Sequence, residues 1–127
     1  MSNKHKSKFK QEYTFEERKA EGERIREKYP DRIPVIVEKA PNAKDTLPDI
    51  DKKKFLVPID IQNSQLSYVI RKRIKLSSDQ AMFLFINGKI PPSSELIGTI
   101  YEKEKDLDSF LYYTYMGEDA YGSDRFL

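Results

Sequence analysis

The amino-acid sequence predicts one α+β domain, a four-stranded mixed β-sheet with a helix packed on one face. The length of 127 residues suits a single domain. Four short runs rich in β-branched and aromatic residues predict the strands, and an amphipathic run between the second and third strands predicts the main helix. A charged helix ahead of the first strand extends this domain.

Residues 1–30 form the predicted N-terminal extension. The first ten residues carry four lysines and no acid. Thr14 and Glu17 have the spacing of a capping box, so a helix is expected to begin after Thr14, and Pro30 is expected to end it. Its apolar residues are few and predict packing through a narrow stripe: Phe15, Ala20 and Ile25.

The core is predicted over residues 31–116, and a tail over 117–127. The core elements, in chain order, are a strand over 32–39, a loop over 40–51, a strand over 54–59, a helix over 63–76, a strand over 81–88, a short helix over 91–104 and a strand over 110–116. This is the order of the ubiquitin-like β-grasp fold, here with an N-terminal helical extension. A ferredoxin-like fold is the less favoured alternative, because it needs a helix between the first two strands, where this chain has a proline-bearing loop.

Single residues refine these elements. Pro34 suits the start of a strand or an edge strand, because proline cannot donate to a ladder. Asn63 or Ser64 is expected to cap the main helix, and Asn87-Gly88 predicts a tight turn. One face of the main helix is apolar: Leu66, Val69, Ile70 and Ile74.

Composition narrows the function classes. Hydrophobic residues make up 38% of the chain and charged residues 35%, with a net charge of only +2, which argues against nucleic acid as a partner. A nucleic-acid site would have to use the basic start and the basic end of the main helix, where Tyr68 is the nearby aromatic residue: Arg71, Lys72, Arg73 and Lys75.

The sequence gives little support for an enzymatic function. The chain has no cysteine, and its single histidine, His5, lies in the lysine-rich start. No Ser/His or Cys/His set is present, so the sequence predicts neither an enzyme, nor a metal site, nor a cofactor. No apolar run reaches the length of a membrane span, and the start lacks the apolar segment of a signal peptide. A cytoplasmic protein is therefore expected.

The chain resembles the autophagy ubiquitin-like modifiers, the group that includes the GABA-type-A-receptor-associated protein. The resemblance runs from about Phe9 to Gly122 and rests on "EYTFEERKAEGERI", "RIPVIVEK", "DKKKFLVP", "YVIRKRI", "FLFING" and "IPPSSELIGTIYEKEKDLDSFLYYTYMGEDAYG". It implies a β-grasp domain preceded by two helices. The chain departs from the family at Thr14, where proline is common, at Leu66, where an aromatic residue is common, and in a longer loop over 42–46.

The resemblance also implies a processing site in the tail. A cysteine protease would cut after Gly122 and release residues 123–127, with Tyr121 as an aromatic contact for the protease. Activating-like and conjugating-like enzymes would then join Gly122 to the amine of phosphatidylethanolamine, placing the protein on autophagosomal and vacuolar or lysosomal membranes. Glycine suits an acyl donor because it lacks a Cβ, so its backbone can enter narrow clefts. The two acyl chains of the lipid would give stable anchoring.

A second implied role is the docking of cargo receptors and adaptors. Such a partner would carry a short motif, an aromatic residue followed by two variable residues and an aliphatic one, and would add a strand beside residues 54–58. The aromatic pocket would use Glu21, Ile25, Pro34, Ile36, Lys54, Leu56 and Phe110. The aliphatic pocket would use Phe55, Val57, Pro58, Ile61, Leu66 and Val69. Charge contacts to acids flanking the motif would come from Arg32, Lys52 and Arg71, together with Lys54.

Two alternatives remain open from the sequence. The apolar pocket residues can be simply core, and the lysines a solvated face. The protein can also be an unconjugated ubiquitin-like adaptor, which shares the fold and the docking edge and differs only in the fate of its tail.

Overall fold

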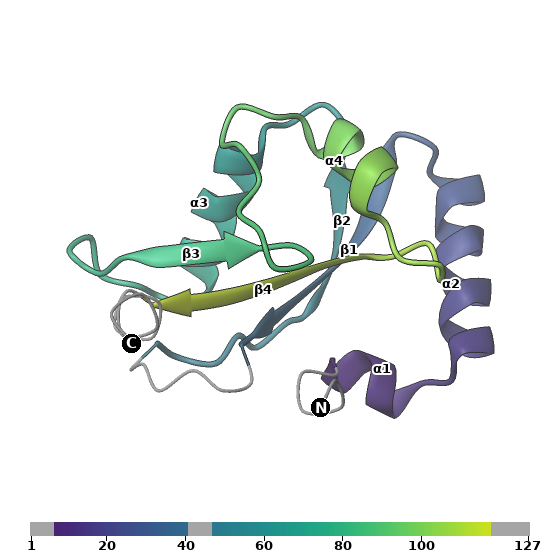
Figure 1. Cartoon of the computed structure of the whole chain (residues 1–127), viewed down its shortest axis with the longest axis horizontal. Helices are drawn as coiled ribbons and strands as arrows, with labels where there is room; N and C mark the ends of the chain where they lie inside the picture. The colour runs from purple at the N-terminus through teal and green to yellow at the C-terminus, as the bar shows by residue number, and fades with distance from the viewer. Residues whose placement is uncertain (1–6, 41–46, 118–127) are drawn as a thin grey trace.

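The computed structural model describes residues 7–40 and 47–117. Its elements, in chain order, are α1 (Lys8–Glu12), α2 (Phe15–Lys28), β1 (Arg32–Lys39), β2 (Lys54–Pro58), α3 (Asn63–Arg73), β3 (Met82–Phe85), α4 (Ile97–Glu104) and β4 (Leu111–Gly117) (Figure 1). The predicted order of strands and helices is confirmed, and α1 is the additional N-terminal helix that the resemblance implied. Gly117, the first residue of the predicted tail, is the last residue of β4.

The four strands form one mixed sheet in the order β2-β1-β4-β3. β1 is antiparallel to β2 and parallel to β4, and β3 is antiparallel to β4. β1 is therefore a central strand, so of the two readings of Pro34 the edge strand is excluded, and Pro34 instead lies near the start of β1. Val37 N–H donates to the Lys53 carbonyl (2.8 Å), which places the odd-numbered amides of β1 toward β2. The missing amide of Pro34 thus costs no bond to β2.

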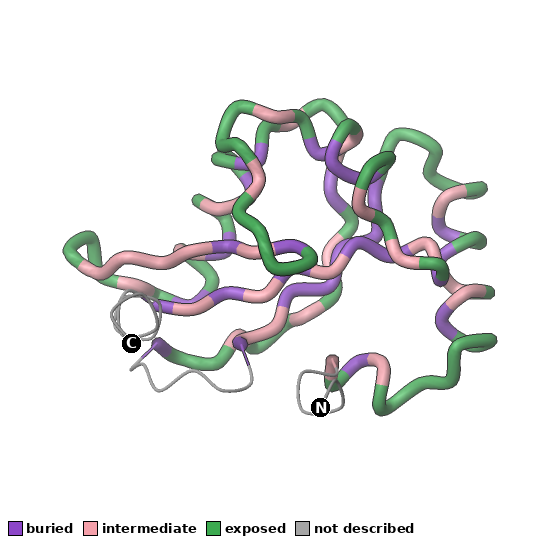
Figure 2. The backbone as a smooth tube through the Cα atoms, viewed as in Figure 1, coloured by how far each residue is buried: buried purple, intermediate pink, exposed green. Residues whose placement is uncertain are grey.

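The main core lies between the sheet and α3, with α4 closing one end (Figure 1). Successive side chains of a strand point to opposite faces, and on this face β1 contributes Ile33, Val35 and Val37. From α3, three residues spaced four apart are buried, whereas Val69 is 45% exposed: Leu66, Ile70 and Ile74. Figure 2 shows the same pattern, with buried residues along the central strands and exposed ones along the outer sides of the helices.

The opposite face of the sheet is covered by α1 and α2. Its apolar cluster is small and consists of Phe9, Ile25, Ile36 and Phe110, with Tyr112 against it. Gly22 of α2 lies so close to the segment before β4 that a Cβ at this position would be 2.4 Å from the Asp108 carbonyl oxygen. The expected stripe is only partly correct, because Phe15 and Ala20 are exposed and α2 instead packs through Arg18, Gly22 and Ile25.

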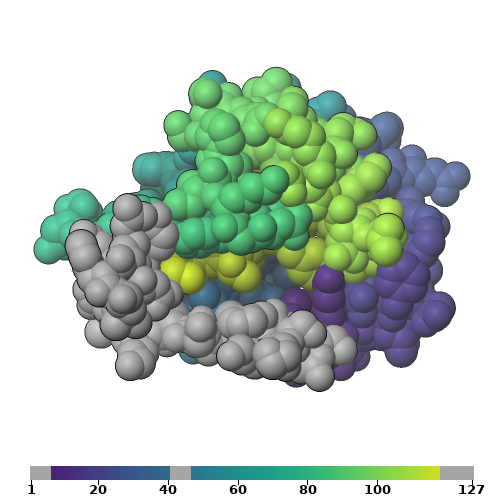
Figure 3. All heavy atoms as spheres, viewed as in Figure 1, coloured from purple at the N-terminus to yellow at the C-terminus, as the bar shows by residue number. Residues whose placement is uncertain are grey.

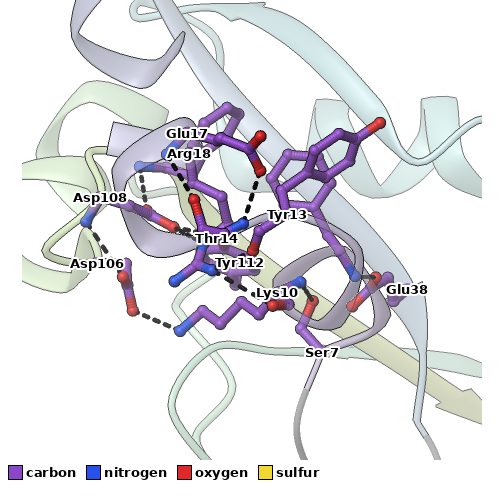
Figure 4. A network of polar contacts seen from close by, with 12 residues as sticks. Ser7, Lys10, Tyr13, Thr14, Glu17, Arg18, Glu38, Asp106, Asp108 and Tyr112 are labelled. Atoms are coloured by element: carbon purple, nitrogen blue, oxygen red, sulfur yellow. Dashed lines mark hydrogen bonds and ion pairs between the residues drawn. The ribbon is translucent and has the colours of Figure 1, made fainter. Parts of the chain in front are cut away.

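Figure 3 shows the N-terminal helices, in purple, packed against the yellow-green segment that leads into β4. A polar network attaches the helices to this segment (Figure 4). Arg18 Nε donates to Asp108 Oδ2 (2.8 Å), and Arg18 Nη1 donates to the Tyr13 carbonyl (2.7 Å). The fully buried Asp108 also accepts from the Tyr112 hydroxyl and from the Phe110 amide. The charge of Asp108 is therefore paired and its oxygens are occupied, as burial requires.

Two residues of α1, Lys10 and Phe9, make further contacts that attach the helix. Lys10 Nζ lies 2.7 Å from Asp106 Oδ1 and 4.5 Å from the centre of the Tyr112 ring. The Phe9 amide donates to Glu38 Oε2 (2.9 Å). Because these contacts join residues far apart in the chain, they hold α1 against the sheet rather than stabilise the helix itself.

The predicted N-cap of α2 is confirmed, and the predicted N-cap of α3 is corrected. At α2, the Thr14 hydroxyl accepts from Glu17 N–H (3.1 Å) and Glu17 Oε1 accepts from Thr14 N–H (2.9 Å), so the capping box is present. At α3, the predicted caps Asn63 and Ser64 already lie inside the helix, and Gln62 is the N-cap. Asn63 is buried and its Oδ1 accepts from the Tyr113 hydroxyl (2.7 Å).

Among the residues that the structure describes, three non-glycine residues have positive φ. Asn87 (51°) and Gly88 (79°) form the predicted turn, closed by a bridge between Ile86 and Lys89. Lys75 (57°) follows α3, and Ser109 (73°) precedes β4. Left-handed backbone is costly for a residue with a Cβ unless it is Asn or Asp, so Ser109 and Lys75 are sites of local strain.

Candidate functional site

The candidate site is β2, an edge strand of the sheet. β1 pairs with one side of β2, and within the described residues no strand pairs with its other side. An edge strand presents unpaired main-chain amide and carbonyl groups, which can accept a further strand from another molecule. The side chains of β2 alternate across the sheet, so Lys54 and Leu56 lie on one face and Phe55 and Val57 on the other. Pro58, predicted for the aliphatic pocket, falls by this alternation on the face of Lys54 and Leu56.

The aromatic-pocket residues gather on the face covered by α2. In the register of β1 with β2, Ile36 lies opposite Lys54 and Pro34 lies opposite Leu56. Ile25, Ile36 and Phe110 are buried beneath and already belong to one cluster. Leu56 is 39% exposed, so it is the apolar member of this set that faces solvent.

An ion pair joins α2 to β2 above these residues. Lys54 Nζ lies 3.2 Å from Glu21 Oε2, and Arg24 binds the same carboxylate at 3.0 Å. Burial alone would raise the pKa of Glu21, but the hydrogen bonds from Arg24 and Lys54 outweigh it and hold the pKa below its ordinary value. Glu21 is therefore ionised at neutral pH, and Lys54 is positioned by it at the edge.

The aliphatic-pocket residues gather on the face covered by α3. Val57 and Leu66 are buried in the main core, and Phe55 and Ile61 pack against that core while remaining partly exposed. Val69 is 45% exposed on the outer side of α3. Pro58, the last residue of β2, is also partly exposed. Sequence and structure thus agree that some of these residues serve the core.

The predicted charge contacts have different surroundings. Lys52 is exposed, with its ammonium 5.2 Å from the centre of the Phe55 ring. Arg32 is exposed and its Nη1 donates to the Leu56 carbonyl (3.4 Å), which places it at β2. Arg71 donates to the carbonyls of Gln80 (2.9 Å) and Ser77 (3.1 Å), so these donors hold the turn before β3. A contact of Arg71 with a motif stays a prediction.

Gly122 and Tyr121, the predicted processing site, lie outside the described residues, as does His5. Among residues 7–40 and 47–117, no group of three His, Cys, Asp or Glu side chains comes together as a metal site would require. Over the same ranges, no helix combines the length and apolar character needed to cross a bilayer.

The comparisons with known proteins decide the family. A family model described as "Autophagy protein Atg8 ubiquitin like" matches residues 17–122. The chain belongs to the Atg8 family. Autophagy-related protein 8e of Arabidopsis thaliana is 58% identical over 115 residues, which cover 91% of this chain and 93% of that protein. Autophagy-related protein 8 of Coccidioides immitis is 56% identical over 118 residues, covering 93% and 99%.

A solved structure confirms the ubiquitin-like fold of this Atg8-family chain. The crystal structure of Trypanosoma brucei ATG8 matches with a TM-score of 0.82 and 42% identity, covering 89% of this chain and 96% of that one. The predicted family, fold class and general role, a ubiquitin-like protein of autophagy, are confirmed by these relatives.

Sequence reasoning missed the long-range polar contacts, both those that attach the N-terminal helices and one that joins β4 to α3. The pair formed by Arg18 and Asp108 joins residues 90 positions apart, and the bond between Tyr113 and Asn63 joins residues 50 apart. Neither has a local signature, because periodicity and capping patterns report only on neighbours within about one helical turn. Arg18 on the polar side of a charged helix looks like any solvated residue.

Proposed function

We propose that this Atg8-family chain is a ubiquitin-like modifier that is conjugated through Gly122 to phosphatidylethanolamine. Family membership supports this, and the family match itself extends to residue 122. A cysteine protease would first remove residues 123–127, and activating-like and conjugating-like enzymes would then transfer the glycyl group. The chain is the acyl donor in this chemistry rather than its catalyst.

We infer that the conjugated protein recruits receptors and adaptors at β2, and the arrangement of the two pocket sets is the observation that supports this most. The two anchors of the proposed motif are three residues apart. In an extended peptide, residues three apart point to opposite faces of the sheet. On β2, Lys54 and Leu56 of the aromatic set lie on the face opposite to Phe55 and Val57 of the aliphatic set, so one added strand would direct an anchor to each face.

The charges beside β2 fit the acids expected before the motif. Lys52 and Lys54 precede or begin the strand, and Lys54 is shared with Glu21. A carboxylate of the peptide would compete with Glu21 for Lys54. Rim charges of this kind act mainly on the association rate and its salt dependence. The location proposed for the working protein is the autophagosomal membrane and the vacuole or lysosome to which it leads.

The tail is tested by three forms of the chain incubated with the protease, activating enzyme, conjugating enzyme, ATP and phosphatidylethanolamine vesicles, with mass measurement of the products. Gly122→Ala should block removal of residues 123–127 and lipid transfer. A chain ending at Gly122 should need no protease and still be conjugated. A chain ending at Tyr121 should bind motif peptides but accept no lipid. Equal lipidation of Gly122→Ala and the parent would exclude this role for Gly122.

The docking edge is tested by titration of a motif peptide onto Leu56→Ala. Leu56 is the partly exposed apolar member of the aromatic-pocket set, so its truncation should weaken binding without unfolding the domain. Leu107→Ala is the matched control, since Leu107 is 84% exposed and lies outside both sets. Normal binding by a folded Leu56→Ala protein would remove β2 as the docking site.

The second candidate function is an unconjugated adaptor. It would use the same edge, so every docking result is compatible with both. Failure of the chain ending at Gly122 to accept lipid, with peptide binding intact, would favour the adaptor.

A further inference from the structure

The end of β4 and the basic end of α3 lie at the same end of the sheet. We name this end of the sheet the tail end. Met82, the first residue of β3, pairs with Gly117, the last residue of β4. The turn just before Met82 is bound to Arg71 of α3 through the Gln80 carbonyl (2.9 Å). Figure 1 shows β4 ending beside the connection from α3 to β3. The last turn of α3 therefore lies close to the point from which residues 118–127 continue.

This last turn and the residue pair after it carry three exposed cations, which we name the basic turn: Lys72, Arg73 and Lys75. Arg73 Nε lies 3.0 Å from Asp51 Oδ1. Lys72 Nζ lies 5.3 Å from the centre of the Tyr68 ring. Within residues 7–40 and 47–117, neither Lys72 nor Lys75 forms an ion pair. The pKa of Asp51 is lowered mainly by the hydrogen bond from Arg73 and also by the charge of Lys75, so Lys75 lies near this carboxylate without binding it. Both ammonium groups can take an external anion.

The opposite end of the sheet carries exposed carboxylates. Ile59 N–H donates to the Asp31 carbonyl (3.1 Å), which brings Asp31 and the following Asp60 together at the start of β1 and the end of β2. Neither carboxylate forms an ion pair in the described part of the chain. β1 has eight residues and runs from this end to the tail end, a length of about 26 Å at 3.3 Å per residue. Both signs of charge occur at each end, because the exposed Arg32 adjoins Asp31 here and the exposed Asp79 lies in the turn before β3 at the tail end.

We propose that the basic turn contacts the phosphate groups of anionic phospholipids once the chain is attached to a membrane. The inference rests on the proposed conjugation at Gly122. Five residues lead from Gly117 to Gly122, and five residues span at most about 17 Å. The tail end must therefore lie near the lipid headgroups, whereas the far carboxylates lie beyond this reach.

Electrostatics favours the same orientation. The Debye length at physiological salt is about 8 Å, so an anionic surface at the tail end attracts the basic turn and is screened from Asp31 and Asp60. Each lysine close to an anionic leaflet raises binding roughly fivefold. β2 would then rise away from the membrane, with Lys54 at its lower end and Pro58 at its upper end. The docking edge stays accessible in this orientation.

The first experiment measures lysine protection on an attached protein. The chain has no cysteine, so a chain ending at position 122 and carrying Gly122→Cys can be joined to a maleimide-headgroup lipid without any enzyme. Acetylation rates of individual lysines are then read by mass spectrometry on vesicles of phosphatidylcholine with or without phosphatidylserine. Lys72 and Lys75 should be acetylated severalfold more slowly on phosphatidylserine vesicles, and high salt should restore their rates.

Lys28 and Lys105 are the matched controls. Their ammonium groups lie 5.5 Å and 5.3 Å from the centres of the Tyr29 and Tyr101 rings, a setting similar to that of Lys72. Neither forms an ion pair among the described residues, and both lie away from the tail end. Equal protection of these controls would overturn the orientation. Equal protection of Lys72 and Lys75 on neutral vesicles would mean shielding by the tether and would overturn the anionic contact.

The second experiment uses variants of an unattached chain ending at Gly122. Lys72→Gln with Lys75→Gln should lower its co-flotation with phosphatidylserine vesicles, by roughly fivefold for each lysine. Lys28→Gln with Lys105→Gln removes the same charge and should leave co-flotation unchanged. Equal losses in the two pairs would overturn the proposal, and so would protection of the basic turn by RNA or an acidic peptide but not by vesicles. Neither experiment uses the conjugating enzymes, so failure of this contact and failure of enzymatic conjugation are separate results.

Discussion

The two faces of the sheet are held by different interactions. Among the described residues, sixteen buried ones form a continuous apolar core on the face of α3. On the face of α1 and α2, the buried apolar cluster has four members, and the ionic network of Arg18 and Asp108 supplies the rest. Apolar burial is tolerant of small shifts, whereas a buried ion pair depends on geometry. The first face therefore defines the fold, and the second decides whether the N-terminal helices stay docked.

The largest expected losses in the free energy of unfolding come from removing one central side chain on each face of the sheet. Asp108→Ala leaves Arg18 buried without its carboxylate, which typically costs about 3–5 kcal/mol. Ile70→Ala opens a cavity in the α3 face and should cost about 2–5 kcal/mol. The free energies of unfolding from urea titration should overlap, but hydrogen exchange should separate the two variants.

The difference lies in where exchange accelerates. Asp108→Ala should expose the amides of α1 and α2 while those of α3 keep most of their protection. Ile70→Ala should lower protection throughout the sheet and α3. If amide hydrogen exchange accelerated uniformly in both variants, the two faces would unfold as one unit. The proposed difference between the faces would then be wrong.

These faces also differ in how far the sequence predicts them. The α3 face follows from local patterns, because Leu66, Ile70 and Ile74 repeat at helical spacing and β1 is a continuous apolar run. The elements of the docking edge follow in the same way, since β2 ends at its proline. The α2 face does not, because its decisive contacts join Arg18 to Asp108 and Lys10 to Asp106, and no short-range pattern encodes such pairs. For the same reason the sequence predicts Asn63 or Ser64 as the cap of α3, whereas both lie inside the helix.

Gly22→Ala sharpens the comparison on the α2 face. Alanine favours a helix by about 1 kcal/mol over glycine, so the change would stabilise an exposed helix. Here the new Cβ would lie 2.4 Å from the backbone oxygen of Asp108, which cannot rotate away. We expect a net loss of about 1–3 kcal/mol by thermal unfolding. Ala20→Gly, on the exposed side of α2, should lose only about 1 kcal/mol, and a stabilised Gly22→Ala protein would contradict the close packing.

Ser109→Gly should act in the opposite direction. Ser109 has a φ of 73°, which glycine adopts without the steric cost of a Cβ. The backbone bonds of this residue, to the Tyr101 hydroxyl and to Asp106, do not need its side chain. The gain is reduced by the greater freedom of glycine in the unfolded chain, so a stabilisation of up to about 1 kcal/mol is expected. Ser94→Gly, at an exposed site, serves as the control; a loss of stability in Ser109→Gly would show that its side chain matters.

The smallest effect is the pH dependence of the contact between Lys10 and Asp106. Burial alone would raise the pKa of Asp106, but the hydrogen bonds from Lys10 and the Asp108 amide outweigh it and lower the pKa below its ordinary value. A carboxyl whose pKa is lowered by folding stabilises the protein above its unfolded pKa of about 3.9, and this stabilisation disappears as the pH falls through the folded pKa. The pair is partly exposed, so its contribution at neutral pH should be about 0.5–1 kcal/mol.

Urea titrations at a series of pH values should therefore show Asp106→Asn less stable than the parent at pH 7 and equal to it below the folded pKa. Asp60→Asn removes a carboxylate without an ion pair in the described structure and should follow the parent throughout. A constant difference between Asp106→Asn and the parent down to the lowest pH would mean that the side chain acts through packing, and the α2 face would then depend less on charge than the contacts of Lys10 indicate.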